Sequence, residues 1–464
     1  MASTSLTRTP SSATNRKTFT ISMWVKRAEL STQQCLFSVG NGSSNPLNFF
    51  GFYLDKFVYW EYSNSTTGLS DLQSNLVLRD PSAWYHLVAS IDTTQATASD
   101  RIKLYVNGTQ VTSFSSSSYP SQNQDLGFNN TQPHDIGRYL YTGTSYYGGE
   151  MAHFHFIDGT AYAPTDFAET DSTSGVWKPK TQPSVTYGTN GFFLKFANSA
   201  SLGTDSSGNG NNFTVNGSGT QTLDTPSNVY ATWNPLIYMP NKPTFENGNL
   251  YVKGHDANYG EAISTLSMAK SGKWYAEFKK IEVNNCFMVG VGNTQNLIEA
   301  LRTNTNISPS GGGYSGGAVT IRDGGDVRQT NVSDISGFFS SSIANGDIIG
   351  IALDLDNGAV YAHKNGTYGV ISSVTGDPTS GASKTGAIDI SGQSWYQNAD
   401  FLCFLFGNTS GAIKDWCQAN FGNGYFGTTA ISSPNSDGAG EGKFAYTVPT
   451  GYYTLNTKNL KTYG

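Results

Sequence analysis

Charged residues are scarce in this sequence, and Asp, Glu, Lys and Arg together make up 13% of its 464 residues. Long amphipathic helices draw on Ala, Leu, Glu and Lys, so this composition disfavours a helical protein. The formal net charge is -6, and no basic run is longer than a pair such as Arg16-Lys17 or Lys279-Lys280. A surface that binds nucleic acid needs clustered Lys and Arg to neutralise phosphates, so we expect no nucleic-acid partner.

Long apolar runs are also absent, and none approaches the length of a membrane span. Residues 1–10 carry no apolar segment of the kind found in secretory signals. We therefore expect a protein that is made in the cytoplasm and has no membrane-spanning segment.

Cysteine is rare and scattered, and Cys35, Cys286, Cys403 and Cys417 form no Cys-x-x-Cys pair. This spacing disfavours both a zinc site and a disulfide framework. Cys403 and Cys417 would meet if their strands were neighbours, but buried free thiols are the favoured interpretation.

Glycine and aromatic residues are abundant, with 52 Gly, 26 Tyr, 26 Phe and 8 Trp. Aromatic residues favour strands, and Gly, Asn and Ser favour the tight turns that join them. Each buried aromatic side chain removes a large area from water, so an apolar fraction of 37% still builds sizeable cores. The length predicts two or three domains, and the composition predicts an all-β fold for them.

The first region, up to about residue 175, contains a series of short alternating segments. Alternate residues from Phe19 to Val25 are apolar and share one face, as in a half-buried strand. Ile102–Gly108 ends in the Asn-Gly pair that favours a hairpin turn. Further segments of this kind follow at 49–53, 56–61, 84–92, 135–138 and 149–158. This spacing predicts an antiparallel β-sandwich.

Five pieces of this region, in this order, resemble the laminin-G-like branch of the concanavalin A-like lectin/glucanase superfamily. They are Trp24, Trp84–Val88, Leu104–Gly108, Ile136-Gly137 and Gly149–Ala152. The likeness is greatest to the version found in virion proteins of tailed bacteriophages, where similar stretches follow the sandwich. In this chain those stretches are 165–169, 175–179, 191–196, 205–213 and 224–228. The resemblance implies a concanavalin A-like jelly roll in a virion protein.

Residues 176–245 are rich in Pro, Gly, Asn and Ser, yet they include Trp177, Phe213 and Trp233. A free linker seldom carries so many aromatic residues, so we expect an ordered connector. Its one apolar strand, Phe192–Phe196, is expected to pair with the first sandwich and partly complete it.

Residues 246–445 carry the motifs of a second sandwich. Gly346–Asp356 runs into Asn357-Gly358 and 359–366 returns, which is the pattern of a β-hairpin. With Lys273–Phe278 and Lys414–Gly424, this hairpin resembles the SPRY (B30.2-like) sandwich family, whose opening strand, hairpin and closing Asn-Phe-Gly all occur in order.

The glycine-rich stretch Ser308–Gly317 interrupts this second match, either as a surface contact or as a tolerated insertion. It does not follow a strand and open a helix, so it is not expected to bind phosphate. The tail, 446–464, is expected to dock on the second sandwich through Val448, Tyr452 and Leu455.

The predicted fold class is therefore all-β, with two antiparallel β-sandwiches (concanavalin A-like jelly rolls) in tandem. The predicted domains are a laminin-G-like sandwich at 1–175, an ordered connector at 176–245, a SPRY-like sandwich at 246–445 and a C-terminal tail at 446–464.

The superfamily of the first module includes glycoside hydrolases, whose reaction needs two carboxylates that flank the scissile bond. The related glucanases carry them on one strand as Glu-x-Asp-x-x-Glu, and this pattern is absent from the chain. In the segment Gly149–Asp158, Glu150 and Asp158 have the same parity but lie far apart. We therefore expect a non-enzyme with no catalytic residue.

The sequence contains candidate ligands for two kinds of metal site, one of histidines and one of aspartates. Strict alternation would place His153 and His155 on one face with Met151 and Ile157, where two imidazoles bind a metal if a carboxylate approaches. A polar stripe on a solvated sheet face is the favoured interpretation.

Laminin-G-like modules sometimes hold Ca²⁺ at the rim, and Asp92, Asp135 and Asp205 with Asn209 and Asn211 are the candidate ligands. Asp, Asn and Gly are also turn formers, and ordinary turns are favoured. No other cofactor is expected.

A ligand-binding stretch follows Asp135, where Arg138, Tyr139, Tyr141, Tyr146 and Tyr147 lie among Gly, Ser and Thr. Sugar rings stack on aromatic side chains, and polar groups bind their hydroxyls, so these residues are a candidate carbohydrate site. Tyrosine is equally typical of subunit contacts, and the sequence does not decide between the two.

The sequence favours a non-enzymatic structural protein of a phage virion, such as a capsid decoration, fibre or tail-associated protein, with lectin-like modules. Other virion proteins, host cell-surface glycans and further copies of the chain, in a homo-oligomer, are the expected partners. The alternative is a dedicated receptor-binding lectin that recognises host polysaccharide, and a glycoside hydrolase is the least favoured hypothesis.

Overall fold

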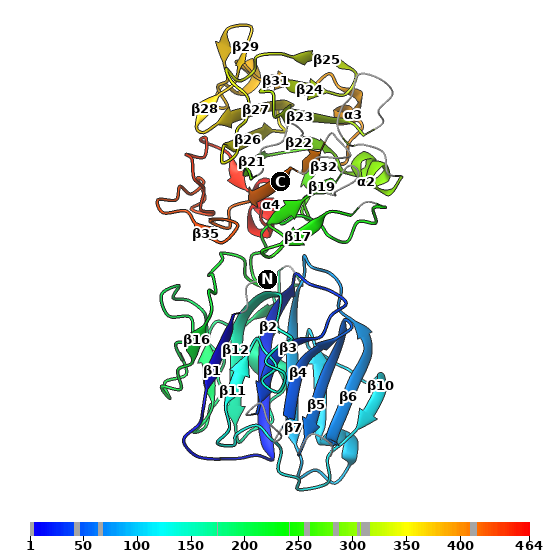
Figure 1. Ribbon diagram of the computed structural model, residues 1–464, viewed down its shortest axis with the longest axis vertical. Coiled ribbons are helices and arrows are strands. Elements are labelled where there is room, and N and C mark those ends of the chain that lie inside the picture. Colours follow the sequence, from blue (N-terminus) through cyan, green and yellow to red (C-terminus); the bar gives the residue numbers. More distant parts are fainter. Residues whose placement is uncertain are drawn as a thin grey trace. The chain divides into compact units, whose positions relative to one another are not determined.

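The computed structural model describes residues 4–40, 47–63, 68–173, 175–240, 242–254, 260–281, 287–303, 307, 316–408 and 415–464. The chain divides into two compact units, and each contains two large β-sheets (Figure 1). The all-β fold of two tandem sandwiches is thus confirmed. The first unit holds residues 1–221 and 225–227, and the second holds 222–224 and 228–464. The boundary between the units thus falls inside residues 176–245, the predicted ordered connector, and each unit contains a part of them.

The first unit has an eight-stranded antiparallel sheet and a six-stranded one. The eight strands, in order across the sheet, are β10 (Phe114–Ser118), β6 (Gly68–Val77), β5 (Lys56–Tyr62), β4 (Leu47–Tyr53), β3 (Gln34–Val39), β11 (His134–Ile136), β1 (Ser5–Arg8) and β16 (Thr214–Asn216). The six are β15 (Phe192–Leu194), β12 (Gly149–Asp158), β2 (Thr18–Arg27), β7 (Trp84–Asp92), β8 (Ile102–Val106) and β9 (Thr109–Gln110). The short elements are η1 (Ala98–Asp100), α1 (Pro164–Phe167), β13 (Ala168–Thr170) and β14 (Trp177–Pro179).

The core of this unit lies between the two sheets. Leu6, Ile136, Phe37 and Phe50 face one another across β1, β11, β3 and β4, and all four are buried. Alternate residues of β2 from Phe19 to Val25 supply apolar side chains from the other sheet, as predicted. Full burial of each such side chain contributes about 1.5–3 kcal/mol, so aromatic strands stabilise a domain that has few charges.

The strand predicted near Phe192 is β15, and it pairs with β12, as expected. The chain between β12 and β15 runs over the outer face of the six-stranded sheet. Thr20 of β2, for example, donates its hydroxyl to the carbonyl of Thr160 at 2.8 Å and accepts from the backbone N–H of Tyr162 at 2.8 Å. We call residues 160–195, that is this connection together with the edge strand β15 in which it ends, the covering segment.

The second unit has a nine-stranded sheet and a seven-stranded one. The nine are β17 (Thr244–Glu246), β18 (Tyr251–Lys253), β33 (Trp416–Asn420), β21 (Lys273–Lys280), β26 (Ile348–Asp354), β27 (Ala359–Lys364) and β28 (Thr367–Tyr368), with β31 (Ile388–Asp389) beside β27 and β36 (Tyr453–Thr454) parallel to β21. The seven are β19 (Ala262–Ile263), β32 (Phe401–Asn408), β22 (Phe287–Asn293), β23 (Ala318–Arg322), β24 (Val327–Gln329) and β25 (Val332–Ile335), with β20 (Met268–Ala269) beside β32. The remaining elements are α2 (Thr294–Arg302), β29 (Val370–Ile371), β30 (Val374–Thr375), η2 (Gly381–Ser383), α3 (Ser394–Gln397), β34 (Tyr425–Phe426), β35 (Thr429–Ala430) and α4 (Thr457–Tyr463).

The predicted hairpin of this unit is formed by β26 and β27, with Asp354 opposite Ala359. Its turn needs a positive φ at Gly358, which has a φ of 64°. The Asp354 carboxylate accepts hydrogen bonds from the backbone and side-chain N–H groups of Asn357, at 3.1 and 2.8 Å. Local turn chemistry thus fixes this hairpin.

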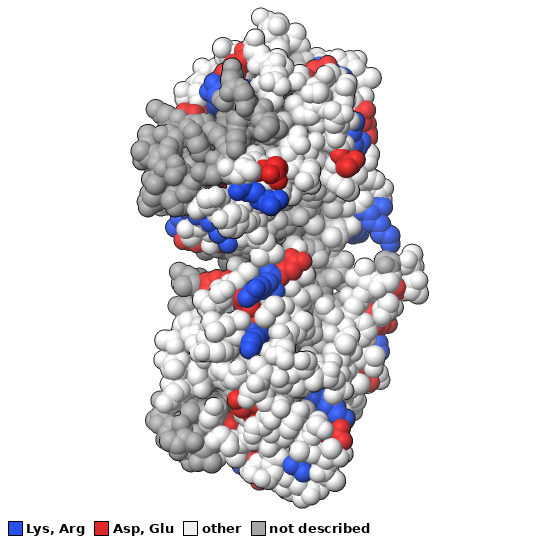
Figure 2. Space-filling view, turned by 90° about the vertical axis from the view of Figure 1, so that its right-hand side faces the viewer, with Lys and Arg blue, Asp and Glu red and all other residues white. Residues whose placement is uncertain are grey.

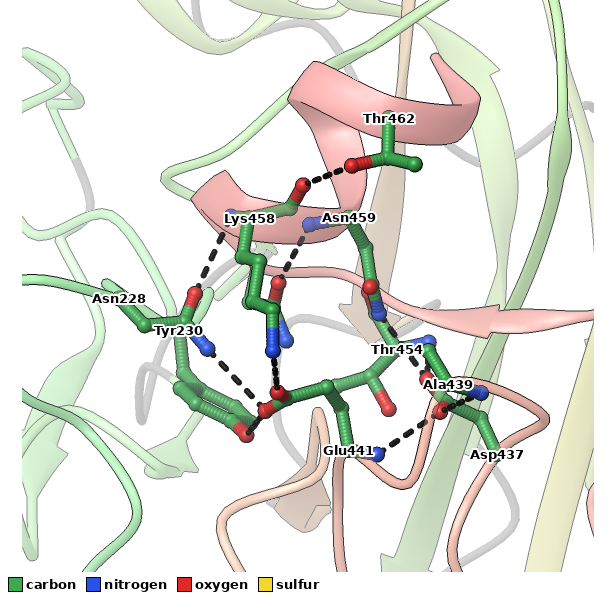
Figure 3. A network of polar contacts seen from close by, with 10 residues as sticks. Asn228, Tyr230, Asp437, Ala439, Glu441, Thr454, Lys458, Asn459 and Thr462 are labelled. Atoms are coloured by element: carbon green, nitrogen blue, oxygen red, sulfur yellow. Dashed lines mark hydrogen bonds and ion pairs between the residues drawn. The ribbon is translucent and has the colours of Figure 1, made fainter.

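The C-terminal tail is an integral part of the second unit. Val448, Tyr452 and Leu455 are buried in its apolar clusters, as predicted. Figure 3 shows how α4 is held: Glu441 accepts from the Tyr230 hydroxyl at 2.9 Å and from the Lys458 ammonium at 2.6 Å. The tail and the segment at residue 230 are therefore fastened to one loop.

Cys35, Cys403 and Cys417 are buried and free, so the prediction of free thiols is confirmed for these three. Cys403 and Cys417 do not pair, and they lie in different sheets and in different apolar clusters. Cys286 lies outside the described residues, as does most of the glycine-rich stretch Ser308–Gly317. In the described ranges, no helix has the length and apolar character needed to cross a membrane.

Candidate functional site

Strand β12 contains a β-bulge that changes the predicted pattern of its side chains. Ala152 lies opposite Trp24 and His155 lies opposite Ser22, so β12 has one residue more than β2 between these pairs. His153 occupies the bulge with a φ of 47°. A bulge reverses the alternation of a strand, so the prediction that Met151 shares the face of His153, His155 and Ile157 is wrong. The two histidine rings do lie together as predicted, with centroids 6.5 Å apart. Met151 packs against the core before the bulge, and Phe154 and Phe156 do so after it.

The same bulge separates Glu150 from Asp158. Glu150 lies opposite Lys26, whereas Asp158 lies opposite the core residue Phe19, so their predicted common face is also wrong. The Asp158 carboxylate accepts from the side-chain amide of Asn129 at 3.1 Å and from the backbone N–H of Asn190 at 3.0 Å. These two acids do not form the facing pair that glycoside hydrolysis needs.

The predicted solvated histidine stripe is instead a covered face. The His155 ring stacks on Phe193 with centroids 3.9 Å apart, and its Nδ1 lies 2.9 Å from the Tyr187 hydroxyl. Trp177 donates its indole N–H to Nδ1 of His86 at 3.2 Å. Trp177 and Tyr187 lie over the sheet, and Phe193 is the neighbour of His155 in the adjacent strand β15. Together they explain why His86 and His155 are buried.

Burial lowers the pKa of His86 to about 3 and that of His153 to about 4, and it lowers the pKa of His155 as well. Neutral imidazoles could ligate a metal, but within the described ranges no three His, Cys, Asp or Glu side chains gather as metal ligands would. The covered face is a structural contact.

The three candidate calcium ligands lie in separate elements and are occupied by hydrogen bonds. Asp205 accepts from the backbone N–H groups of Phe193 and Asn211, each at 2.9 Å. Asp92 accepts from the hydroxyl of Thr94 at 2.6 Å. These are the contacts of turn-forming aspartates, and they favour ordinary turns over an ion.

An open polar groove lies on the first unit, beside β1 and β16, with a volume of about 800 Å³. We call it the Arg8–Arg138 groove, after the two arginines in its lining. The rest of the lining consists of Thr, Ser, Asn and Gly from residues 7–11 and 210–216. It contains no carboxylate and no large apolar side chain. Figure 2 shows a different face of the molecule, on which uncharged residues predominate.

One wall of the groove is formed by the pairing of β1 with its neighbours β11 and β16. Thr7 of β1 lies opposite Asp135 of β11 and Thr214 of β16, on the outer face of the eight-stranded sheet. Asp135 is buried, and it accepts from Nε of Arg138 at 2.7 Å and from the hydroxyl of Thr7 at 3.1 Å. Burial raises the pKa of Asp135, although Arg138 acts in the opposite direction. The predicted calcium ligand is thus the residue that positions Arg138.

The opposite wall is the loop that follows Asp205. Its Asn211 accepts a hydrogen bond from the Arg8 guanidinium at 2.5 Å and donates to the carbonyl of Gly191 at 2.8 Å. Asp205 fixes this loop from below through the backbone of Asn211. Two segments about 200 residues apart in sequence therefore form one groove, with Arg8 between them.

The structure divides the predicted ligand-binding residues into two sets. Tyr139 is buried against Phe49, with ring centroids 5.1 Å apart, and Tyr147 donates its hydroxyl to the carbonyl of Lys26 at 2.7 Å. Both rings pack inward, which disfavours them as ligand contacts. Tyr141 is 39% exposed, and Tyr146 lies near enough to Arg138 to help raise the pKa of its guanidinium. Arg138, Tyr141 and Tyr146 remain available at the surface.

Sequence reasoning missed Arg8 and Thr7 altogether. Both lie in a short strand with no motif, and only its pairing with β11 and β16 brings them to Arg138 and Asn211. The Asp205–Asn211 run was found, but as a cation site. Its alternating Asp, Asn and Gly are equally the signal of the structured loop that it forms.

These features define a class of protein: a tandem β-sandwich with an open polar groove on its first unit. A comparison with family models sharpens the class, because the model of the concanavalin A-like lectin/glucanases superfamily matches residues 2–166. This match covers most of the first unit and agrees with the resemblance seen in the sequence. A comparison with curated proteins finds no match.

Solved structures give distant likenesses. The SPRY domain of human HERC1 is 15% identical, with 40% of this chain and 96% of that one covered and a TM-score of 0.27. Domain 4 of AbnA, a GH43 extracellular arabinanase from Geobacillus stearothermophilus solved with arabinotriose, is 17% identical, with coverages of 32% and 65% and a TM-score of 0.25. A SAP-like pentraxin from Limulus polyphemus is 12% identical, with coverages of 35% and 73% and a TM-score of 0.27. At these scores the likenesses carry no argument about function.

Proposed function

We propose that this chain is a non-enzymatic structural protein of a phage virion, and that its first sandwich binds glycans through the Arg8–Arg138 groove. The observation that carries the glycan-binding part is the groove itself. It is open, it has a volume of about 800 Å³, and polar side chains and glycines line it. It lies on the unit that matches a superfamily described by its lectins and glucanases.

The chemistry of the lining suits a sugar. Hydroxyl and amide side chains can donate to and accept from sugar hydroxyls, and guanidinium groups add fixed donors. The groove is held by strand pairing and by the Asp205 loop, so its donors are largely preorganised. Because no carboxylate lines it, the groove lacks the acid and base of a glycosidase, and binding without turnover is the proposed outcome.

The virion part of the proposal rests on the sequence pattern of the first 228 residues and their resemblance to virion proteins of tailed bacteriophages. In such a setting other virion proteins and further copies of the chain are the proposed partners. Capsid decoration, fibre and tail-associated positions all fit this proposal. A dedicated receptor-binding lectin is the second candidate, because the same open groove would serve it.

A glycan array probed with the full chain tests the binding proposal. We expect specific signals that are lost in the variant Arg8→Gln and kept in Arg79→Gln, which changes an exposed arginine outside the groove. An array with no signal contradicts glycan binding. Mass spectrometry of purified particles tests the virion proposal, and a chain absent from them contradicts it.

The non-enzyme proposal has its own test. Purified chain incubated with β-glucans is expected to release no reducing sugar, with or without the change Glu150→Gln. Release that this change abolishes would show a hydrolase and overturn the proposal.

A further inference from the structure

The charge inventory of the Arg8–Arg138 groove is one-sided. Its lining contains two guanidinium groups and no carboxylate, although the whole chain has more acidic than basic residues. Arginine stays charged at any pH at which the protein is folded. A ligand in this groove therefore meets two permanent cations among neutral hydrogen-bonding groups.

The nearest carboxylates do not present themselves to a ligand. Asp135 has no exposed side-chain surface, and it is held by Arg138 and Thr7. The carboxylate of Asp205 accepts hydrogen bonds from backbone N–H groups of its own loop and from the hydroxyl of Ser207, at 2.8 Å. Both acids therefore organise the walls from behind, while the cations line the groove.

Both arginines keep donors beyond those contacts. A guanidinium has five N–H donors. The contacts of Arg138 with Asp135 are made by Nε and Nη2, and the hydrogen bond of Arg8 to Asn211 is made by Nη2. The Arg138 side chain is 25% exposed. The planar fork of an arginine matches a carboxylate, and such charge-assisted pairs are about twice as strong as neutral hydrogen bonds.

We propose that the groove selects acidic saccharides, with Arg8 and Arg138 binding the carboxylate of a uronic or sialic acid and the Thr and Asn side chains binding its hydroxyls. This inference rests on the proposed glycan binding and names its ligand class. It assigns the charge selectivity to both guanidinium groups, each of which has one carboxylate nearby, Asp135 for Arg138 and Asp205 for Arg8.

Matched pairs of acidic and neutral sugars test the inference by calorimetry on the full chain. One pair is trigalacturonate and its methyl ester, and the other is 3'-sialyllactose and lactose. We expect at least one acid to bind about tenfold more tightly than its neutral partner, and this preference to weaken as salt rises. Arg8→Gln should abolish the preference, Arg8→Lys should keep part of it, and the control Arg79→Gln should leave it unchanged.

Each contrary outcome is informative. Equal binding of acid and neutral partner, with binding itself intact, overturns the acidic-sugar inference and leaves glycan binding standing. Absence of binding to all four sugars overturns the inference, and an array without signals overturns the proposed function as well. A poly-aspartate peptide that binds as tightly as the acidic sugar shows that the groove recognises carboxylates alone, which also overturns the saccharide class. Thermal unfolding of every variant confirms that lost binding is not lost folding.

Discussion

Two polar regions of the first unit differ in whether a later part of the chain covers them: the outer face of the six-stranded sheet, and the groove beside β1 and β16. On the six-stranded sheet, the covering segment buries Trp24, His86 and His155. Burial lowers the pKa of the two histidines, so their imidazoles are neutral. On the eight-stranded sheet, the Arg8–Arg138 groove stays open and keeps its charge. The types of the polar residues alone therefore do not show which groups are covered and which stay open to solvent. The decisive difference is whether a later segment of the chain covers the face.

The largest expected effect concerns the covering segment, whose packing separates the buried face from the open groove. Phe193 is 4% exposed and stacks on His155, so Phe193→Ala removes a buried ring and leaves a cavity. We expect the free energy of unfolding of the first unit to fall by about 3–5 kcal/mol. Urea unfolding followed by tryptophan fluorescence measures this. The control Leu76→Ala, at a residue that is 45% exposed, should change stability by less than about 0.5 kcal/mol.

Acid should distinguish the two units. Burial lowers the pKa of His86, His134, His153 and His155 in the first unit, whereas the second has His363 alone among its described histidines. A histidine in the unfolded chain has a pKa near 6.5, whereas His86 has a pKa of about 3 and His134 and His153 have pKa values of about 4 in the folded protein. The unfolded state therefore gains protons first, and each such histidine costs about 1.4 kcal/mol of stability per pH unit below 6.5.

Hydrogen exchange between pH 6.5 and 5 measures this difference, once corrected for the intrinsic pH dependence of exchange. The first unit is expected to lose protection before the second. Equal loss in both units, or loss confined to the second, contradicts the assignment of neutral buried histidines.

The groove side of the contrast depends on Asp135. The change Asp135→Asn removes the charge that holds Arg138 and leaves a buried amide beside a guanidinium. We expect a loss of about 1–3 kcal/mol in stability, together with weaker glycan binding, because Arg138 is no longer oriented. Denaturation and array binding of one preparation give both values. Unchanged binding would show that Arg138 does not need this partner.

The smallest expected effect concerns the tyrosines beside the groove. Tyr141 is 39% exposed, so Tyr141→Ala should leave stability within about 0.5 kcal/mol of the parent chain. Its contribution to glycan binding should stay below about fivefold, as for a residue at the rim of a site. Tyr139→Ala is the opposite case, because that ring is buried and its loss should destabilise the unit. Equal effects of the two changes on stability would contradict the assignment of Tyr141 as exposed and Tyr139 as buried.

The sequence predicted well what depends on neighbouring residues. The Asn357-Gly358 hairpin and the inward face of Phe19–Val25 follow from local turn chemistry and alternation, and both were found as expected. The bulge at His153 was not predictable, since one extra residue in a ladder leaves no mark in a sequence of alternating His and Phe. Its consequence was large, because it reversed every side chain that follows it in β12.

The site was predictable only in part, for a related reason. Arg138 was found because it stands in a visibly unusual stretch with Tyr141 and Tyr146. Arg8 was missed, because the pairing of β1 with β11 and β16 joins segments more than 120 and 200 residues apart. The pairing of short strands that are far apart in sequence depends on the whole fold, so no local sequence pattern predicts it.

The most direct test of the central claim is hydrogen exchange of the full chain with and without the best-binding saccharide from the array. The open groove should be the face that responds. We predict slower exchange in residues 4–9, 137–147 and 205–216, and unchanged exchange in the covering segment. Protection confined to the covering segment, or to the second unit, would contradict the assignment of the Arg8–Arg138 groove as the binding site.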